Sequence, residues 1–194
     1  MDPIRVGICG FGTVGCGTFS VLARNSQDIA ARVGRDVIVT HIGARRDNPR
    51  CDTGTTRVSR DVFDVVRDPE VDIVVELIGG CDTARRLVME AIAAGKHVVT
   101  ANKALIAEHG NEIFAAASAR GVTVAFEAAV GGGIPIIKAI REGLAANRIE
   151  WVAGIINGTT NFILSEMRAK GLDFGVVLKE AQRLGYAEAD PTFD

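Results

Sequence analysis

A glycine-rich turn near the N-terminus constrains the fold of this chain more than any other feature. Gly10, Gly12 and Gly15 form a G-x-G-x-x-G pattern between the apolar run Ile4 to Cys9 and the helical stretch Thr13 to Arg24. In this strand-to-helix context Gly10 permits a tight turn, Gly12 lets a pyrophosphate approach the backbone, and Gly15 lets helix and strand pack closely. We therefore predict a dinucleotide site here, the alternative being a glycine-rich turn without a ligand.

The alternation of strand-like and helix-like segments continues beyond this turn. Four more apolar runs indicate strands: Val37 to Gly43, Asp72 to Ile78, His97 to Thr100 and Val122 to Phe126. Helical stretches lie between or after them: Asp61 to Arg67, Thr83 to Ala94 and Asn111 to Ala119. Nearly continuous apolar strands are typical of a parallel sheet that is covered on both faces. The prediction is an α/β fold with a Rossmann-type, doubly wound parallel sheet.

The alternation changes near residue 150. A helix from Ile134 to Ala146 is predicted to lead into a strand from Glu150 to Ile156. Helices from Thr159 to Ala169 and from Phe174 to Leu184 follow without an intervening strand. We therefore predict a nucleotide-binding domain over residues 1–149 and the beginning of a second, α+β domain over residues 150–194.

Composition excludes several classes of protein. The 22 Lys and Arg residues against 24 Asp and Glu residues leave a net charge of −2, and no basic stripe suits nucleic acid. Because no signal peptide and no apolar run of about 20 residues is evident, we expect a cytoplasmic protein without a membrane partner. The four cysteines and three histidines show no zinc-site spacing, so we expect reduced thiols and structural histidines. The expected partner is a small molecule.

Two positions beside the predicted site bear on the cofactor. The second strand ends in Arg45 and Arg46, where a site specific for NAD usually has an acidic residue. Two guanidinium groups suit a 2′-phosphate, so NADP is favoured over NAD, unless the pair is merely solvated. Ile78 and Gly79, at the end of the third strand, leave room for cofactor, although a plain turn explains them equally well.

Three later segments carry polar groups at places where ligands bind. Lys103 follows the fourth strand and lies at the edge where open α/β sheets bind ligands; a surface lysine is the alternative. The glycine-rich loop Glu127 to Pro135 offers a carboxylate and main-chain oxygens to a hard cation, or is a bare turn. Near the end, Gly185 caps a helix, and Glu188 and Asp190 could hold an ammonium group or form a solvated loop.

Together these segments resemble homoserine dehydrogenase over essentially the whole chain. The resemblance is carried by Gly10 to Gly15, Thr100 to Leu105, Glu127 to Pro135, Asn157 to Asn161 and Ala181 to Asp194. It implies an enzyme that interconverts L-homoserine and L-aspartate 4-semialdehyde with NADP or NAD, in the biosynthesis of threonine and methionine. It also implies that the second domain binds substrate and forms a homodimer in the full-length protein.

The resemblance also assigns roles to residues around the cofactor. Phe11, Thr13 and Val14 would contact the pyrophosphate, while Arg45 and Arg46 would meet the adenosine phosphate. Lys103 and Gly185 would lie against the cofactor. The other predicted cofactor-binding residues come from the glycine pattern and the end of the third strand, and are Gly10, Gly12, Gly15, Ile78 and Gly79.

Other roles implied by the resemblance concern the substrate and a cation. Lys103 would also assist proton transfer at the reacting oxygen, and Glu188 would bind the amino group of the substrate. A monovalent cation such as sodium would be held by the family's corresponding positions, which are Glu127, Val130, Gly132 and Ile134.

The sequence departs from the family at its end. The family continues past this region to a lysine that is its principal acid/base residue, whereas this chain stops at Asp194. We therefore expect a piece of a longer protein that binds cofactor but turns over poorly. The alternatives are a dinucleotide-binding module with a sensing or regulatory role, and a related amino-acid dehydrogenase, which we would not expect to share Asn157 to Asn161.

Overall fold

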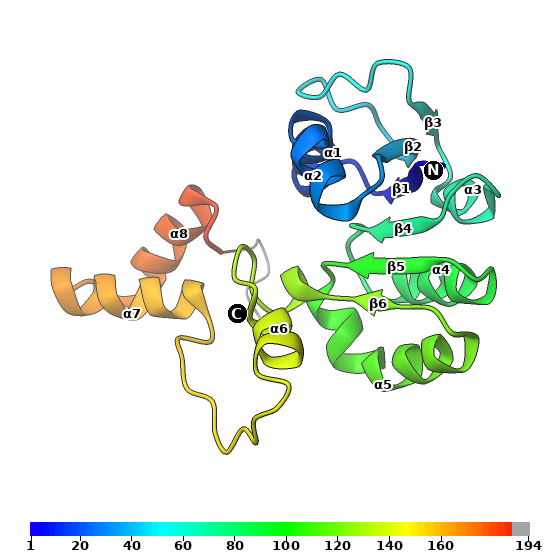
Figure 1. The fold of residues 1–194 in the computed structure, drawn as a ribbon. Helices are drawn as coiled ribbons and strands as arrows, with labels where there is room; N and C mark the ends of the chain where they lie inside the picture. The colour runs from blue at the N-terminus through cyan, green and yellow to red at the C-terminus, as the bar shows by residue number, and fades with distance from the viewer. Residues whose placement is uncertain (188–194) are drawn as a thin grey trace. The chain divides into compact units, whose positions relative to one another are not determined.

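The computed structural model describes residues 1–187, and a six-stranded parallel sheet forms its centre. The strand order is β3-β2-β1-β4-β5-β6, so the chain moves outward from β1 in one direction and then in the other (Figure 1). The strands are β1 (Ile4–Cys9), β2 (Val37–Gly43), β3 (Arg57–Ser59), β4 (Ile73–Glu76), β5 (His97–Thr100) and β6 (Val124–Ala125). The predicted α/β, Rossmann-type fold is thereby confirmed.

Helices connect the strands and continue beyond the sheet. They are α1 (Thr13–Arg24), α2 (Ser26–Val33), α3 (Val62–Arg67), α4 (Asp82–Ala93), α5 (Lys103–Arg120), α6 (Ile136–Lys138), α7 (Gly158–Lys170) and α8 (Phe174–Leu184). A 3₁₀ turn, η1 (Glu127–Ala129), and a π turn, η2 (Ala139–Gly143), lie on either side of α6. The chain divides into one unit over Met1–Ala145 and a second that begins at Ala146. No helix of the described residues is long and apolar enough to cross a bilayer.

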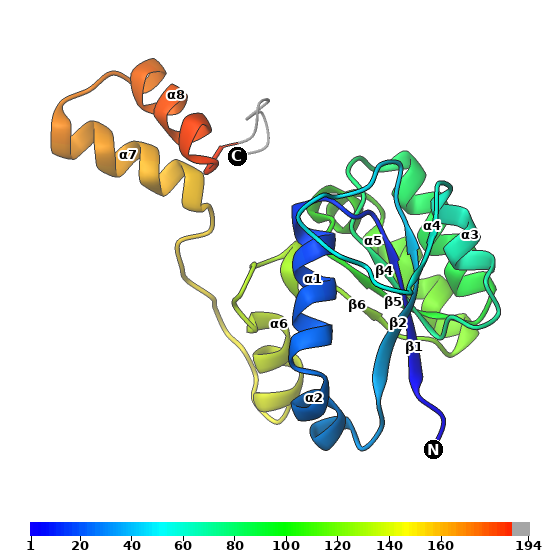
Figure 2. The ribbon, with the colours of Figure 1, turned by 90° about the horizontal axis from the view of Figure 1, so that it is seen from above.

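Two apolar clusters fill the two faces of the sheet. Leu87 and Leu105, from α4 and α5, are fully buried in a cluster to which α3 also contributes side chains. On the opposite face, Ile8 and Ile42 are fully buried, with Phe19 of α1 packed against them. Figure 2 shows α1 and α2 on one side of the strands and α3 and α4 on the other. The nearly continuous apolar character of the strands thus reflects burial on both faces.

Several predicted elements agree with the structure and others differ. The bounds of β1, β2, β5, α1 and α8 are confirmed. Helix α5 begins eight residues before the predicted start at Asn111, because Asn102 caps it and the buried Gly110 is tolerated inside it. The prediction missed α2, which follows α1 directly, and β3, whose three largely exposed residues lack an apolar signal.

The predictions for the segment around residue 150 are wrong. The strand predicted from Glu150 to Ile156 is irregular, with Trp151 78% and Ile156 88% exposed. Within residues 1–187 no strand pairs with it, and a β-strand needs a partner for its main-chain groups. The helix predicted from Ile134 to Ala146 is reduced to α6 and the π turn after it.

Candidate functional site

The turn between β1 and α1 has the geometry that the glycine pattern predicts. Gly10 has a φ of 99°, and its amide donates to the carbonyl oxygen of Gly43 at 2.8 Å. A Cβ on Gly15 would lie 2.1 Å from the carbonyl oxygen of Gly10, whereas a Cβ on Gly12 would meet nothing within 4 Å. Gly10 and Gly15 therefore shape the turn, and Gly12 leaves open space above it.

The first turn of α1 presents unused main-chain donors. Gly12 is the N-cap and supplies no side-chain hydrogen bond. Thr13 and Val14 are exposed, and within the described residues their amides donate to no acceptor. Phe11 is buried instead, with its ring edge-on to Phe19 at 5.8 Å between centroids. A helix start with free amides is a site for a phosphate group.

The loop after β2 carries the two predicted arginines. Arg45 and Arg46 are exposed, and neither forms an ion pair within residues 1–187. Asp47, the acidic residue that follows them, is bound by Arg60 through both carboxylate oxygens at 2.9 and 3.0 Å. Two free guanidinium groups thus lie beside a carboxylate that already has a partner.

Asn48 ties this loop to the glycine-rich turn. Its Nδ2 lies 3.2 Å from the carbonyl oxygen of Phe11 and 3.3 Å from that of Gly12, and donates toward both. Sequence reasoning missed Asn48, because its partners lie 37 and 36 residues before it in the chain. Contacts over such separations leave no local signal in the sequence.

A buried carboxylate lies at the end of β4. Glu76 is fully buried; its Oε2 accepts from the Thr100 hydroxyl at 2.5 Å and its Oε1 from the amide of Ile78 at 2.8 Å. Burial raises the pKa of Glu76, and the hydrogen bonds only partly oppose this. Within the described part of the chain, no ion pair reaches it. Sequence reasoning also missed Glu76, although an acidic residue in an apolar strand is itself a signal.

Asn102 joins the turns that follow β4 and β5. Its Oδ1 accepts from the amide of Leu105 at 3.0 Å and caps α5, while its Nδ2 donates to the carbonyl oxygen of Gly80 at 2.7 Å. Lys103, the first residue of α5, is exposed, and no ion pair engages it within the described residues. Lys103 is thus held at the capped start of α5, and its ammonium group is free of ion pairs within the described residues.

These turns share one edge of the sheet. All strand pairs are parallel, so the carboxyl ends of β1, β2, β4 and β5 point the same way. The turns that follow them hold the glycine pattern, Arg45 and Arg46, Ile78 and Gly79, and Lys103. The strand order reverses between β1 and β4, which is where open α/β sheets bind dinucleotides.

The predicted cation loop has partly committed oxygens. The two carboxylate oxygens of Glu127 accept from the amides of Ile137 and Lys138 at 2.7 and 3.0 Å. The carbonyl oxygen of Ile134 accepts from Ile136, whereas those of Val130 and Gly132 accept no hydrogen bond from residues 1–187. No group of three or more His, Cys, Asp or Glu side chains in that range could hold a metal ion. Main-chain oxygens therefore remain available, and Glu127 also anchors the start of α6.

The second unit contains one more predicted cofactor residue. Gly185 ends α8 in the left-handed conformation, with a φ of 78°. Tyr186, which follows it, packs its ring on Phe162 at 5.0 Å between centroids, and its carbonyl oxygen accepts from Thr159 at 2.5 Å. Asn157 caps α7 by accepting from the amide of Thr160 at 2.7 Å. Glu188, the predicted substrate residue, lies outside the described residues.

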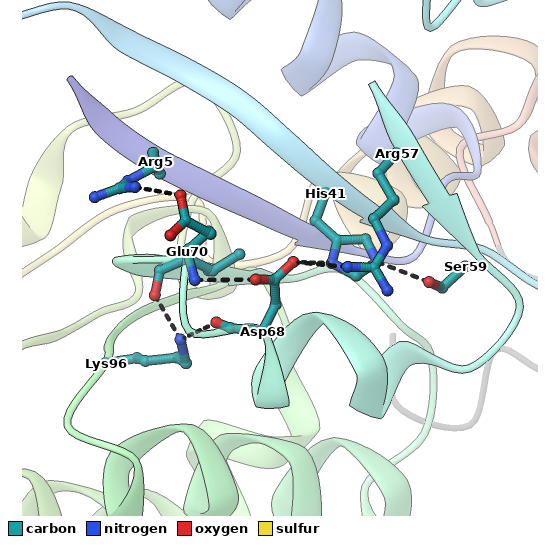
Figure 3. Close-up of polar contacts among 8 residues, drawn as sticks. Arg5, His41, Arg57, Ser59, Asp68, Glu70 and Lys96 are labelled. Atoms are coloured by element: carbon teal, nitrogen blue, oxygen red, sulfur yellow. Dashed lines mark hydrogen bonds and ion pairs between the residues drawn. The ribbon is translucent and has the colours of Figure 1, made fainter. Parts of the chain in front are cut away.

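A second polar network lies away from these turns. The two ring nitrogens of the fully buried His41 are 2.7 Å from Asp68 Oδ2 and 2.7 Å from Ser59 Oγ (Figure 3). Arg57 also pairs with Asp68 at 3.3 Å. Because Asp68 ends α3 and Ser59 ends β3, the network fastens the edge strand to a helix, which is a structural role.

A cleft of about 780 Å³ lies at the opposite, amino edge of the sheet. Its charged groups already have partners: Arg35 donates to the carbonyl oxygen of Asp2 at 2.6 Å, and Lys96 donates to main-chain oxygens at 2.6 and 2.5 Å. Asp72 accepts from the amide of Arg5 at 2.8 Å. The cleft is large, but these charged groups are not free to bind a ligand. The carboxyl edge of the sheet is therefore the better candidate for the functional site.

Comparisons with known proteins agree with this geometry. Residues 10–127 match the family model of the homoserine dehydrogenase NAD-binding domain, and residues 135–194 match the homoserine dehydrogenase model. A homoserine dehydrogenase from Pseudomonas aeruginosa is 70% identical over the whole chain, which spans only 45% of that protein. The chain thus covers less than half the length of such curated relatives.

Two solved structures share the fold over the whole chain. The homoserine dehydrogenase from Thiobacillus denitrificans is 67% identical with a TM-score of 0.94, and the match covers 45% of that protein. A hyperthermophilic archaeal homoserine dehydrogenase in complex with NADPH is 27% identical with a TM-score of 0.83, and the match covers 65% of it.

Proposed function

The chain belongs to the homoserine dehydrogenase family, and we propose that it provides the cofactor-binding part of an enzyme interconverting L-homoserine and L-aspartate 4-semialdehyde. The observation that carries the proposal is the uncapped start of α1, where Gly12, Thr13 and Val14 present open space and free amides. Gly10, Gly15 and Phe11 would complete this pyrophosphate site by shaping the turn. The proposal extends to a role in threonine and methionine biosynthesis and to a homodimer of the whole protein.

The proposed cofactor is NADP, with NAD as a weaker ligand. Arg45 and Arg46 have no other ion-pair partner in the described part of the chain, and guanidinium groups bind phosphate in bidentate geometry. Asp47 is the acidic residue nearest the end of β2, but Arg60 already holds both of its oxygens. The preference for a 2′-phosphate over a free ribose hydroxyl follows from these two arrangements.

Lys103 is the proposed proton donor on this part of the site. The cofactor, when bound, supplies or accepts a hydride at the carbon that is interconverted between aldehyde and alcohol. The Lys103 ammonium would then stabilise the developing alkoxide and give it a proton. Ile78 and Gly79 would lie along the cofactor. In the second unit, Gly185 would also contact it, and Glu188 would bind the amino group of the substrate.

A monovalent cation is proposed at the loop after β6. The free carbonyl oxygens of Val130 and Gly132 are ligands that suit a hard cation such as sodium. The carbonyl oxygen of Ile134 and the carboxylate of Glu127, which also accept main-chain hydrogen bonds, complete the proposed set. The cation would brace the loop that leads toward the second unit. Its chemistry is structural, and no step of the proposed reaction passes through it.

Two measurements test the proposed function. Isothermal titration of the 194-residue chain with NADPH tests cofactor binding, and we expect saturable binding that is tighter than for NADH. The absorbance of reduced nicotinamide after mixing with homoserine and NADP⁺ tests the dehydrogenase activity, in the chain and in a longer protein that contains it. Absence of NADPH binding would contradict the proposal. Binding with no turnover in either protein would favour a sensing or regulatory module.

A further inference from the structure

One hydrogen-bonded chain links the turns that follow β4 and β5. The carboxylate of Glu76 accepts from the amide of Ile78 and from the Thr100 hydroxyl, and that hydroxyl accepts from the amide of Asn102 at 3.0 Å. The side chain of Asn102 completes this series of hydrogen bonds by donating to the carbonyl oxygen of Gly80, in the turn after β4, at 2.7 Å. A single buried carboxylate thus fixes both turns relative to each other.

We propose that Glu76 is a positioning residue of the cofactor site, whose buried carboxylate holds the two turns ready for the nicotinamide half of the dinucleotide. This inference rests on the proposed function. Ile78 and Gly79 lie in the turn after β4, and Lys103 follows the turn after β5. A shift in the position of either turn would therefore displace groups that would contact the cofactor. Glu76 itself is fully buried and acts through its neighbours.

The direction of each hydrogen bond requires a carboxylate at this position. Thr100 Oγ1 accepts from the Asn102 amide, so the hydroxyl proton is directed to Glu76. The other oxygen of Glu76 faces the N–H of Ile78. A glutamine would place its NH₂ group against one of these donors and leave it without an acceptor. The network therefore requires Glu76 as a carboxylate, because both of its side-chain oxygens accept hydrogen bonds.

Stability alone does not explain why a carboxylate is buried at position 76. A buried charge without a cation partner is costly, and apolar residues of similar volume commonly pack as well or better. The neighbours of Glu76 in β4, Val74 and Val75, are apolar and buried, so the strand itself does not require a carboxylate. A role in arranging the two turns accounts for this residue.

The position of the network also predicts which half of the cofactor it serves. Arg45 and Arg46 follow β2, on one side of the point where the strand order reverses, whereas Glu76 and Thr100 end β4 and β5 on the other. Each half of such a sheet binds one mononucleotide of the dinucleotide. If the adenosine half lies near β2, loss of Glu76 should affect the nicotinamide half selectively.

The test compares two ligands in three proteins: the wild-type chain, Glu76→Gln and the control Asp68→Asn. The control makes the same carboxyl-to-amide change in the network around His41. By isothermal titration, Glu76→Gln should raise the Kd for NADPH about tenfold and change the Kd for adenosine 2′,5′-bisphosphate, which lacks the nicotinamide half, by less than about twofold. Asp68→Asn should leave both Kd values within about twofold of the wild-type values, even if this variant has a lower Tm.

A second pair of variants keeps the test decisive if Glu76→Gln folds poorly. Thr100→Val removes the hydroxyl with little change in volume and should weaken NADPH binding, while Thr100→Ser keeps the hydroxyl and should restore most of the affinity. The inference is overturned if Glu76→Gln and Thr100→Val bind NADPH like the wild type, or if they weaken both ligands equally. Failure of the wild type to bind NADPH contradicts the proposed function instead.

Discussion

The main chains of Gly10 and Gly15 approach so closely that a Cβ on Gly15 would lie 2.1 Å from the carbonyl oxygen of Gly10. Backbone cannot move away as a flexible side chain can, so Gly15→Ala must displace the turn or the start of α1. We expect a loss of about 1–3 kcal/mol in the free energy of unfolding, as for other overpacked sites. Urea denaturation followed by circular dichroism measures it, and NADPH binding should be lost as well.

Gly17 provides the matched control for Gly15. It lies in the same helix, and a Cβ there would meet nothing within 4 Å. Gly17→Ala should raise stability by roughly 0.5–1 kcal/mol, because alanine has the better helix propensity. Equal stability of the two alanine variants would contradict the steric explanation for Gly15.

Gly12→Ala separates a role in binding from a role in folding. Gly12 has a φ of −77°, outside the left-handed region that favours glycine, and the space around its position is open. We expect the free energy of unfolding to change by less than about 1 kcal/mol, the usual range for an N-cap exchange. The added methyl group would occupy the space proposed for the pyrophosphate, so titration with NADPH should give at least about a tenfold higher Kd. A variant that binds NADPH normally would place the phosphates elsewhere.

Arg45→Ala and Arg46→Ala test the proposed preference for NADP. Each guanidinium group is free of ion pairs within the described residues, and its hydrogen bonds to a phosphate are worth about 1.5–3 kcal/mol. Each substitution should therefore raise the Kd for NADPH by about 10–100-fold. NADH, which lacks the phosphate, is the internal control, and its Kd should change by less than about threefold. Parallel losses for both cofactors would contradict the assignment.

The elements that the sequence predicted best are those with a local signal. The bounds of β1 and α1 are marked by an apolar run and by the glycine pattern, and Gly185 ends α8 as a left-handed cap. The strand β3 has no such signal, since its three residues lie at the edge of the sheet and are largely exposed. The segment from residue 150 to 156 has a strand-like composition, but a strand also requires a partner, which composition does not reveal.

The site was predictable only where it depends on single turns. Arg45, Arg46 and Lys103 could be proposed because each follows a strand end, and the parallel sheet brings these ends to one edge. Asn48 could not, because its partners lie tens of residues away in sequence. Glu76 is marked by its charge in an apolar strand, but the sequence does not reveal its partner Thr100. Glu76 meets Thr100 only through the register of β4 and β5, in which these two residues are paired.

The network around Asp68 predicts how stability depends on pH. Burial is the largest influence and acts to raise the pKa of Asp68, but the amide of Glu70, then His41 and Arg57, together hold it below its usual value. A carboxyl group with a lowered pKa stabilises the folded state above its unfolded pKa of about 4, and this contribution is lost as the pH falls through the lower folded value.

Asp68→Asn should therefore be less stable than the wild type by about 1–3 kcal/mol at pH 7, the cost of impairing a buried hydrogen-bonded pair. The difference should stay constant down to about pH 4 and narrow below it, because the wild type loses the charge that the variant already lacks. Urea denaturation at several pH values between about 3 and 7 measures this. Asp36→Asn, at an exposed carboxylate, is the control and should follow the wild type throughout. A difference that persists undiminished at the lowest pH would show that the charge of Asp68 does not stabilise the fold.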